Sequence, residues 1–534
     1  MSKLLPQHAL ASETRRDYTA WAVGIGAVVV SVVAFIVTYR HGVVLSYKDA
    51  ISHLEIARRV GESNNPGLAQ LGSVWLPLPH VLMLPFVWID SLYYSGIAGA
   101  IVSMLAYVVA TVFVYKIVSR LLANQSLVAR RVAGVAGAAV FALNANVLYM
   151  QSTPMTEMLL FATLLGAVYS LITWADEQRL GQLIASAVWG SLAILTRYES
   201  WPVMVILALI ALVIAWRNGA KEGLSRKTRG LLLQEVAIVH GVMLAVTVAI
   251  WLLWNLVLFG DAFSFQDGEY AKPSLWLTTN EPSIGHLWVS VKTFGYAFLE
   301  NVPWPAAVAA GVGLLAFLVI ERLKSRSLPI LSLFVAPPFM VWAIYTGTRP
   351  LHVAQVYGDL YNVRFGLIMV LPVAILLGYL VGVVGRFKVV AVTLALAVLL
   401  GTGTLTAQAV QKNNVVTLDE PQEDRPLLQE EIARQFKSLY DSGDVLMESF
   451  GNEVVGFGSV PSQVHVYEGT NRNDRWERSL AKPAEMNIKW IVTRCMPDYM
   501  DKVCKQITEH PEVLTGYKRV YQRPDDAYRI YERN

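Results

Sequence analysis

The sequence predicts a mainly α-helical, multi-pass membrane protein that carries a C-terminal α/β domain. The first observation is composition: 54% of the 534 residues are hydrophobic and only 16% are charged, less charge than soluble domains of this length carry. The second is a series of apolar runs, each near the ~20 residues that a helix needs to cross the hydrocarbon core. The third is a polar tail in which short strands and helices alternate.

Eleven apolar runs are predicted to span the membrane, with an error of about two. The first is interpreted as a retained span and not as a cleaved secretory signal, because it is long and no small-residue cleavage site follows it. The spans are placed at 18–38, 97–118, 132–149, 158–174, 183–195, 202–216, 233–259, 303–320, 330–345, 366–384 and 389–407. A membrane domain at 1–410 and an outer domain at 411–534 follow.

Basic residues predict the orientation. With the N-terminus in the cytoplasm, the inner loops hold most of the Lys and Arg residues that precede the tail, including Arg15, Arg16, Arg130, Arg131 and Arg386. Cytoplasmic loops carry such an excess. An odd number of spans then places the C-terminal domain outside the cytoplasm of an integral, multi-pass cell-membrane protein.

The tail is predicted to fold as a small α/β domain. Apolar runs typical of strands lie at 445–450, 463–467, 489–493 and 528–532, and helices are expected at 425–441 and 497–510. Residues 419–426 are interpreted as the linker that precedes the domain. Cys495 and Cys504, the only cysteines, either form a disulfide outside the cell or remain two unpaired thiols.

The first outer loop begins with SYKDAISHLEIARR, residues 46–59. It predicts a short amphipathic helix that carries Asp49 and His53 one turn apart on one face. Asp49 is either a helix N-cap, a position that Asp favours, or an acid of an extracytoplasmic active site. Arg58 follows, and His80 lies in an apolar segment that its prolines should restrict to an interfacial helix.

Two histidines alone are a weak signal for a metal site. No cofactor is therefore predicted with certainty, and a divalent cation is the one cofactor left open. The long loop at 259–286 carries Lys272 and is expected to cover a site as a flap.

Charged residues also mark the starts of three later spans. Glu157 either interacts with the helix dipole or shares a cavity with Asp49, since a carboxylate at membrane depth is costly. Arg197 and Glu199, in TRYESW, are two residues apart and are not expected to face each other on a helix. Arg364 follows Arg349 and Tyr361 in the loop before the tenth span, where it either snorkels to headgroups or binds a phosphate through its guanidinium.

Taken in order, these segments resemble the GT-C glycosyltransferases, a class of polytopic enzymes that take sugars from polyprenyl-phosphate carriers. The closest likeness is to the branch of aminoarabinose transferases and protein O-mannosyltransferases. It rests on Asp49 with SHLEIARR, on WLPLPH, and on PMTE, TRYESW and YNVRFG, and it covers residues 18 to 407.

The resemblance implies that Asp49 is a general base, that Glu157 helps to hold the acceptor or a cation, and that Arg364 contacts the carrier phosphate. The other candidate substrate-binding residues are His53, Arg58, His80, Arg197, Glu199, Lys272, Arg349 and Tyr361. This sequence departs from the family at two places. Ala50 stands where a second carboxylate is common, and the segment 74–77 lacks the lysine usual before the proline-rich helix.

The expected function is transfer of a sugar from a polyprenyl-phosphate carrier to a lipid, glycan or protein acceptor on the extracytoplasmic face. Asp49 accepts the proton of the attacking hydroxyl or amine, and Arg364, Arg349 or Arg197 stabilises the leaving phosphate. This direct displacement predicts an inverting enzyme. We find no Gly-rich phosphate loop for a soluble nucleotide donor, and nucleic acid is not an expected partner.

The competing class is a non-catalytic lipid- or glycan-binding protein, or a transporter. Spans that are nearly free of charge argue against an ion-coupled carrier.

Overall fold

The structure, a computed structural model, describes residues 17–72, 74–272, 281–385, 388–412, 414–423, 427–468, 474–496 and 499–534. Arg15, Arg16 and Arg386, which entered the orientation argument, lie outside these residues. So do parts of three expected segments: the loop at 259–286, the linker and the helix at 497–510.

The described chain forms two compact units. Unit 1 comprises the described residues within 1–44, 100–251 and 277–423, and unit 2 comprises those within 45–99, 252–276 and 424–534. Each unit is described by itself. The domain boundary at residue 410 stays a prediction.

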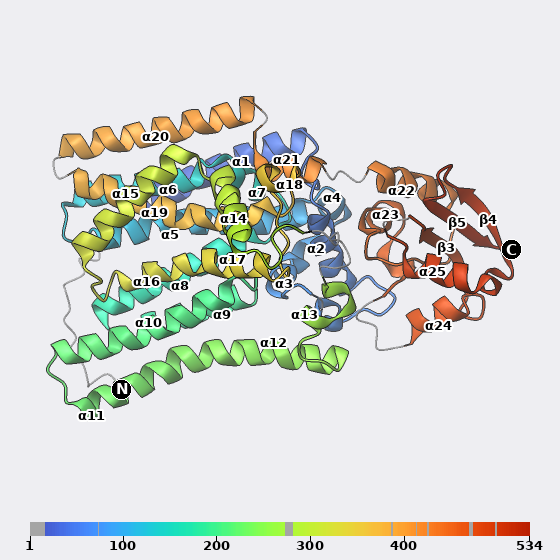
Figure 1. Cartoon of the computed structure of the whole chain (residues 1–534), viewed down its shortest axis with the longest axis horizontal. Coiled ribbons are helices and arrows are strands. Elements are labelled where there is room, and N and C mark those ends of the chain that lie inside the picture. The colour runs from blue at the N-terminus through green and yellow to red at the C-terminus, as the bar shows by residue number, and fades with distance from the viewer. Residues whose placement is uncertain are drawn as a thin grey trace. The chain divides into compact units, whose positions relative to one another are not determined.

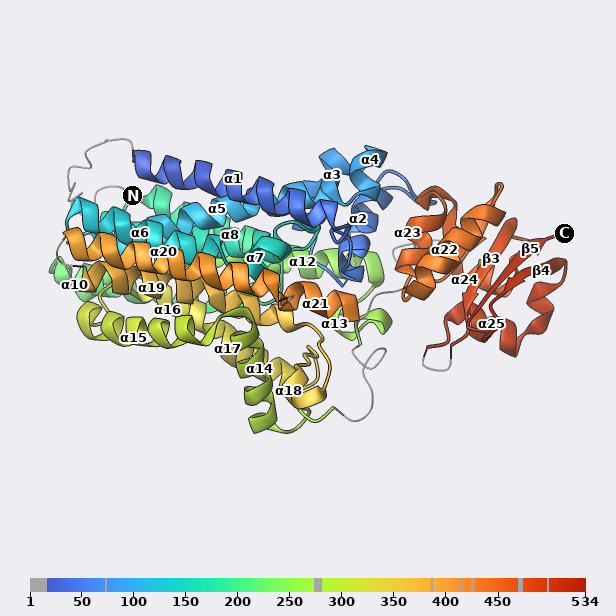
Figure 2. The same ribbon diagram turned by 90° about the horizontal axis from the view of Figure 1, so that it is seen from above.

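Unit 1 is helical (Figures 1 and 2). Its longer helices are α1 (Tyr18–Arg40), α5 (Ile97–Leu121), α6 (Leu127–Ala142), α8 (Glu157–Glu177), α9 (Leu180–Ile194), α10 (Ser200–Lys221), α11 (Arg226–Val236), α12 (Met243–Phe259), α14 (Leu287–Asn301), α15 (Trp304–Glu321), α17 (Ala336–Tyr345), α19 (Val370–Val384) and α20 (Lys388–Gln411). The shorter ones are α7 (Ala145–Met150), η2 (Ala237–Val242), α16 (Leu328–Leu331), η5 (Ser332–Val335), α18 (Ala354–Tyr357), η6 (Val363–Met369) and α21 (Val416–Glu423). The expected linker thus begins inside a helix, α21.

Within the described residues, nine helical segments are long and apolar enough to cross a membrane. They coincide with nine of the eleven predicted spans. The other two correspond to α6 and α9, which have 16 and 15 residues. Helix α6 ends early because Asn144 begins the next helix, where its side chain accepts a hydrogen bond from the N–H of Val147. The prediction of a multi-pass membrane protein is confirmed, with a span count inside its expected error.

Small residues allow close helix packing between α6 and α19 in unit 1. A Cβ atom placed on Gly378 of α19 would lie 2.8 Å from the carbonyl oxygen of Ala133 and 3.0 Å from the Cα of Gly137, both in α6. The two backbones therefore touch. Such contacts between small residues drive helix association where lipid replaces water, and this one fixes the helix that follows Arg364.

Unit 2 contains the loop that follows α1. It forms α2 (Lys48–Arg59), η1 (Leu68–Leu71), α3 (Leu78–Val87) and α4 (Asp90–Tyr94), and a second loop adds α13 (Ser264–Asp267) and η3 (Glu269–Ala271). Helix α2 is the predicted amphipathic helix. Helix α3 is the predicted proline-interrupted helix, and its 10 residues are too few to span a membrane.

The C-terminal part of unit 2 is built on a five-stranded sheet of order β2-β1-β3-β5-β4. The strands are β1 (Asp444–Leu446), β2 (His465–Val466), β3 (Ile488–Arg494), β4 (Tyr517–Gln522) and β5 (Tyr528–Arg533). Strand β1 runs parallel to β2 and β3, whereas β5 is antiparallel to β3 and β4. Four strands were predicted. Strand β4 was missed because it lies at the sheet edge, half exposed, and its sequence YKRVYQ has no apolar run.

Helices cover both faces of this sheet (Figure 2). Trp490 and Val492 of β3 pack with α22 (Leu427–Leu439) and α23 (Glu453–Ser459), and Ile491 packs on the other face with α24 (Arg475–Ala481) and α25 (Lys502–Glu509). Alternate residues of a strand point to opposite faces, so one strand fills both cores. The predicted α/β domain is confirmed.

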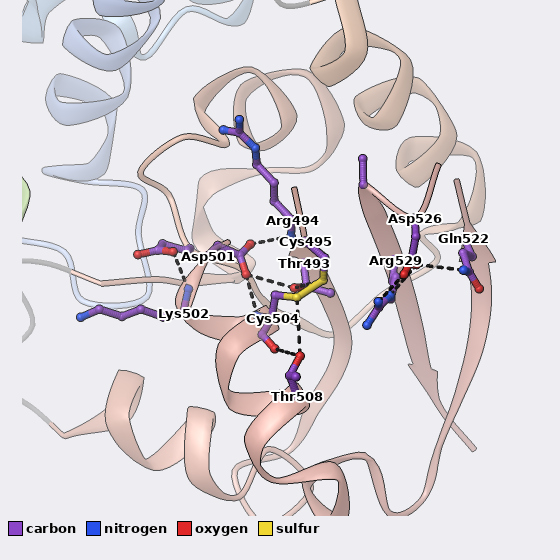
Figure 3. Close-up of a disulfide and its surroundings, with 12 residues drawn as sticks. Thr493, Arg494, Cys495, Asp501, Lys502, Cys504, Thr508, Gln522, Asp526 and Arg529 are labelled. Carbon is purple, nitrogen blue, oxygen red and sulfur yellow. Dashed lines mark hydrogen bonds and ion pairs between the residues drawn. A yellow bond between two sulfur atoms is a disulfide. The ribbon is translucent and has the colours of Figure 1, made fainter. Parts of the chain in front are cut away.

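Cys495 and Cys504 form a disulfide between the end of β3 and helix α25 (Figure 3). Asp501 lies inside the loop that this bond closes. Its carboxylate accepts hydrogen bonds from the N–H of Cys504 at 2.7 Å, as the N-cap of α25, and from the N–H of Arg494 at 2.6 Å. Of the two alternatives for the cysteines, the structure has the bonded one.

We predict that Gly378→Ala destabilises the protein by about 1–3 kcal/mol, the usual cost of overpacking, because the new methyl group must push two backbones apart. Gly401→Ala is the matched control. It lies in α20 with nothing within 4 Å of its Cβ position, so it should be neutral or stabilising by up to about 1 kcal/mol. Thermal unfolding of both variants in detergent measures the difference, and equal melting temperatures would contradict the packing argument.

Candidate functional site

Charged residues at the starts of three spans meet at one end of unit 1. Glu157 begins α8, Arg197 and Glu199 precede α10, and Arg364 lies in η6 just before α19. Because these residues contact one another, the second, third and fifth outer loops of the prediction share one end of the unit. The three loops therefore lie at the same end of the helices, and which side of the membrane this is stays a prediction.

Arg197 is held between two carboxylates. Its Nη1 donates to Glu157 Oε1 at 2.9 Å and to Thr156 Oγ1 at 2.8 Å. Its Nη2 and Nε donate to the two oxygens of Glu199 at 3.0 and 3.3 Å. The sequence offered no reason to expect this pair, because two residues two positions apart do not face each other on a helix. They do face each other here because both lie in the connection between α9, which ends at Ile194, and α10, which begins at Ser200.

Arg364 bridges Glu157 and a further carboxylate, that of Glu420. Its Nη1 donates to Glu420 Oε1 at 3.0 Å, and its Nε lies 3.4 Å from Glu157 Oε1. Glu420 belongs to α21 and also accepts the backbone N–H groups of Asn362 at 3.0 Å and Arg364 at 3.4 Å. Sequence reasoning missed Glu420, which fell in the expected linker, because its partners lie more than 50 positions away.

We refer to Glu157, Arg197, Glu199, Arg364 and Glu420 as the ionic cluster. It is buried: the side chains of the four residues other than Arg197 are 4–8% exposed, and the Arg197 side chain is 14% exposed. Three carboxylates face two guanidinium groups, so the cluster has an excess of negative charge when all are ionised. Buried charges are tolerated only when they are paired in this way.

A cavity of about 10 Å³, room for about one water molecule, adjoins the ionic cluster. It is lined by Glu157, Leu160, Phe161, Arg197, Glu199, Met340, Arg364, Phe365 and Ile368. Glu157 Oε2 is buried and makes no hydrogen bond within the described part of the chain. A buried carboxylate oxygen without a partner is costly, so the cavity is the place where a hydrogen-bond donor would stabilise it.

Arg349 lies beside the same turn, with its guanidinium 5.4 Å from the centre of the Tyr198 ring. Burial favours the neutral form of Glu199, but Arg197 and Arg349 outweigh it and lower the pKa of Glu199 to about 2. Glu199 is therefore ionised near neutral pH. Tyr361, which lies between Arg349 and Arg364 in the sequence, forms an isolated antiparallel β-bridge with His352.

Asp49 belongs to unit 2, where it lies half-buried in the first turn of α2. Tyr47 is the N-cap residue, so the interpretation of Asp49 as an N-cap was wrong. An acid in the first turn still interacts favourably with the helix dipole. Asp49 also acts on Glu453 at the start of α23: burial raises the pKa of Glu453, the charge of Lys48 opposes this, and the charge of Asp49 adds to it.

His53 and His80 are in direct contact in unit 2. Nδ1 of His53 lies 2.9 Å from Nε2 of His80, and both side chains are buried. Burial and the neighbouring His53 hold the pKa of His80 well below its usual range, so His80 is neutral near neutral pH. Within the described ranges, no group of three His, Cys, Asp or Glu residues is arranged to hold a metal ion.

Two further candidates occupy other positions in unit 2. Arg58 pairs with Glu62 and Asp90, each at 2.6 Å, and lies over the ring of Tyr93, which ties α2 to α4. Lys272 is exposed and is the last described residue before 281, so the prediction of a flap stays a prediction.

Helix α2 is attached to the C-terminal part of unit 2 through residues that sequence reasoning did not select. Glu55 pairs with Arg59 at 3.1 Å. Arg59 donates to Ser449 Oγ at 2.8 Å and lies 4.0 Å from the centre of the Tyr467 ring. The i,i+4 spacing of an acid and a base in LEIARR was the signal that would have identified the first pair.

Residues 93–233 match the family described as dolichyl-phosphate-mannose-protein mannosyltransferase, a segment that includes Glu157, Arg197 and Glu199. No curated protein matches the sequence significantly.

Three solved structures are similar. ArnT from Cupriavidus metallidurans bound to undecaprenyl phosphate has a TM-score of 0.52 at 12% identity, over 96% of this chain and 98% of ArnT. The apo state of the same ArnT has a TM-score of 0.52 at 13% identity, over 95% of this chain and 98% of ArnT. The oligosaccharyltransferase AglB from Archaeoglobus fulgidus was solved in complex with an inhibitory peptide and a dolichol-phosphate. It has a TM-score of 0.48 at 12% identity, over 97% of this chain and 74% of AglB.

The chain has an ArnT-like fold, and its residues 93–233 match the dolichyl-phosphate-mannose-protein mannosyltransferase family. Both findings agree with the resemblance to the GT-C class that the sequence motifs indicated.

The buried acids of unit 2 predict a pH dependence. Burial raises the pKa of Glu55 from 4.5 to about 7, against the opposing charge of Arg59, and raises the pKa of Asp501 from 3.8 to about 7, against its backbone hydrogen bonds. Between about pH 4.5 and 7 the folded protein therefore binds more protons than the unfolded chain. Stability should fall as pH rises through this window.

Melting temperatures measured from pH 5 to pH 8 test this expectation. Glu55→Gln should flatten the decline, because it removes one titrating group, whereas Glu477→Gln, at an exposed position of α24, should leave it unchanged. A melting temperature that rises with pH over this range would refute the assignment.

Proposed function

We propose that this protein transfers a sugar from a polyprenyl-phosphate carrier to an acceptor on the extracytoplasmic face, with inversion at the anomeric carbon. The observation that carries the proposal is the buried ionic cluster at the shared end of three spans in a GT-C fold. The donor class is supported by two relatives: the matched family is described by dolichyl-phosphate-mannose, and ArnT was solved with undecaprenyl phosphate.

The proposed reaction is a single displacement. An acceptor hydroxyl or amine attacks the anomeric carbon and forms the new glycosidic bond, while the bond from that carbon to the phosphate oxygen breaks. The electron pair stays on the lipid phosphate. The proton of the nucleophile passes to the carboxylate of Asp49, the general base. Attack from the face opposite the leaving group inverts the configuration.

Arg364 is proposed to bind the leaving phosphate, since a guanidinium suits phosphate geometry and stabilises the charge that develops. Glu157 is proposed to hold the acceptor, which is supported by the free Oε2 at the cavity. Arg197 and Glu199 then act as positioning residues for Glu157. Arg349 adds positive charge to this end of the unit.

The other substrate-binding candidates are proposed to take part in binding and not in the chemical step. His53, His80, Lys272 and Tyr361 are proposed to contact the sugar or the acceptor, which is a lipid, a glycan or a protein side chain. Arg58 is the least suited of the substrate-binding candidates, because two carboxylates already hold its guanidinium.

We also propose the orientation predicted from the sequence, with the N-terminus in the cytoplasm and residues 411–534 outside it. The basic excess of the inner loops supports it. The disulfide between Cys495 and Cys504 supports it as well, because disulfides persist in oxidising compartments.

A reporter fused after Asn534 tests this orientation. Alkaline phosphatase, which needs an oxidising compartment, should be active in the fusion, and a green fluorescent reporter that folds only in the cytosol should be dark. The same reporters fused after Lys221, in a predicted inner loop, give the reverse pattern and serve as the control. A bright fluorescent fusion at Asn534 would overturn the orientation.

Asp49→Asn tests the chemistry. The amide keeps the size of the side chain but cannot accept the proton, so turnover should fall by about a hundredfold or more. The melting temperature should change little, since loss of a first-turn acid costs only about 0.3–1 kcal/mol.

Turnover is measured with purified protein, a lipid-phosphate sugar and candidate acceptors, and Glu477→Gln, at an exposed acid of the same unit, is the control for lost charge. Full activity in Asp49→Asn would remove Asp49 as the base. Binding of the lipid without any transfer by the wild type would favour the alternative of a non-catalytic lipid- or glycan-binding protein.

A further inference from the structure

An anion-binding cradle lies at the start of η6. Asn362 has a φ of 54°, in the left-handed region, and the next residues turn as a right-handed helix. This combination directs the N–H groups of residues 362 and 364 to one side, a concave arrangement that binds anions in many proteins. The guanidinium of Arg364 completes the cradle, so three donors converge on one point.

The anion in this cradle is part of the chain. Both carboxylate oxygens of Glu420 are used: Oε1 accepts from the N–H of Asn362 and from Nη1 of Arg364, and Oε2 accepts from the N–H of Arg364. Glu420 is 5% exposed. A carboxylate and a phosphodiester each carry one negative charge and present oxygen acceptors, so the same donors suit both.

The space beside the cradle does not admit a phosphate while Glu420 is in place. The adjoining cavity of about 10 Å³ has room for about one water molecule. Glu157 Oε2, buried and without a hydrogen-bond partner among the described residues, lines the same cavity. An added anion would face three carboxylates, whereas exchange of Glu420 for a phosphodiester leaves the total charge unchanged.

Helix α21, which carries Glu420, is short, and Val416 at its start packs in the core with Val363 and Phe365. It has only eight residues and contains Pro421, which cannot donate an internal hydrogen bond. Thr417 attaches it to α7, with N–H and Oγ1 donating to Asn146 Oδ1 at 3.2 and 3.1 Å. Neutral hydrogen bonds of this kind contribute only about 0.5–1.5 kcal/mol each.

We propose that Glu420 is a tethered competitor of the donor: it occupies the phosphate position in the resting protein, and α21 withdraws it when the lipid phosphate binds. This inference rests on the proposed function, because it assumes that Arg364 receives the carrier phosphate. Its consequence is that donor affinity is set by the exchange of two anions and not by the cradle alone.

Binding of a polyprenyl-phosphate mannose, the phosphodiester form of the carrier, to the purified full-length protein in detergent tests the inference. Glu420→Gln keeps the shape of the side chain and removes its charge, so the lipid should bind about tenfold more tightly, because a larger fraction of the protein is competent to bind. Arg364→Lys loses the fork of donors and should bind about tenfold more weakly, alone or combined with Glu420→Gln. Glu222→Gln, an exposed acid of unit 1, should bind like the wild type.

Glu420→Asp provides a second variant in case the glutamine disturbs folding. It keeps the charge but withdraws the carboxylate from the cradle by one methylene, and it should also bind more tightly. A melting temperature accompanies each affinity.

The outcomes separate the two levels of the argument. Wild-type binding that Arg364→Lys weakens but neither Glu420 variant strengthens would overturn the competitor and leave the proposed function standing. No binding by the wild type or by either Glu420 variant would overturn both. Binding by Glu420→Gln where the wild type binds weakly would support the competitor directly.

Discussion

The ionic cluster of unit 1 is the interaction on which the rest of the candidate site depends. It joins the first residues of α8, α10 and η6 to α21, and these elements come from parts of the chain far apart in sequence. Charges at membrane depth are expensive, and removing one partner of a buried pair costs about 3–5 kcal/mol. Each member is therefore both a structural tie and a candidate ligand. Loss of activity on deletion of one member does not by itself reveal a chemical role, and this is why the informative variants keep shape and change charge.

The elements predicted best are those that a local pattern determines. Apolar runs of about 20 residues locate the long helices because hydrophobicity alone decides what lies in lipid. The helix at Lys48–Arg59 and the proline-limited helix at Leu78–Val87 followed from amphipathic spacing and from the backbone of proline. Strand β4 escaped because an edge strand exposes polar side chains and lacks the signal of burial.

The side-chain pairs within the site could not be predicted from local sequence patterns. Arg197 faces Glu199 because a turn, not a helix, separates α9 from α10. His53 and His80 share a hydrogen bond across 27 positions. Arg59 of helix α2 donates a hydrogen bond to Ser449, 390 positions away. The segment that carries Asp49 therefore packs with the C-terminal part of unit 2, which its local sequence does not indicate. Only the folded chain reveals which charges balance each other.

Under the proposed function, a tethered anion explains how a cluster with more carboxylates than guanidinium groups would serve a phosphate. An empty cationic cradle in a buried place would have to be filled by water or by a stray anion, and both satisfy it poorly. Glu420 fills it at the high effective concentration of a tethered group, on the order of millimolar, and therefore keeps Arg364 oriented between turnovers. The same carboxylate would refill the cradle as the lipid phosphate leaves, so Arg364 does not remain unpaired at any stage. The excess negative charge of the cluster then has a physical reason: it weakens the hold of the site on its anionic product, and Glu420 is the member that can move aside when the next donor arrives.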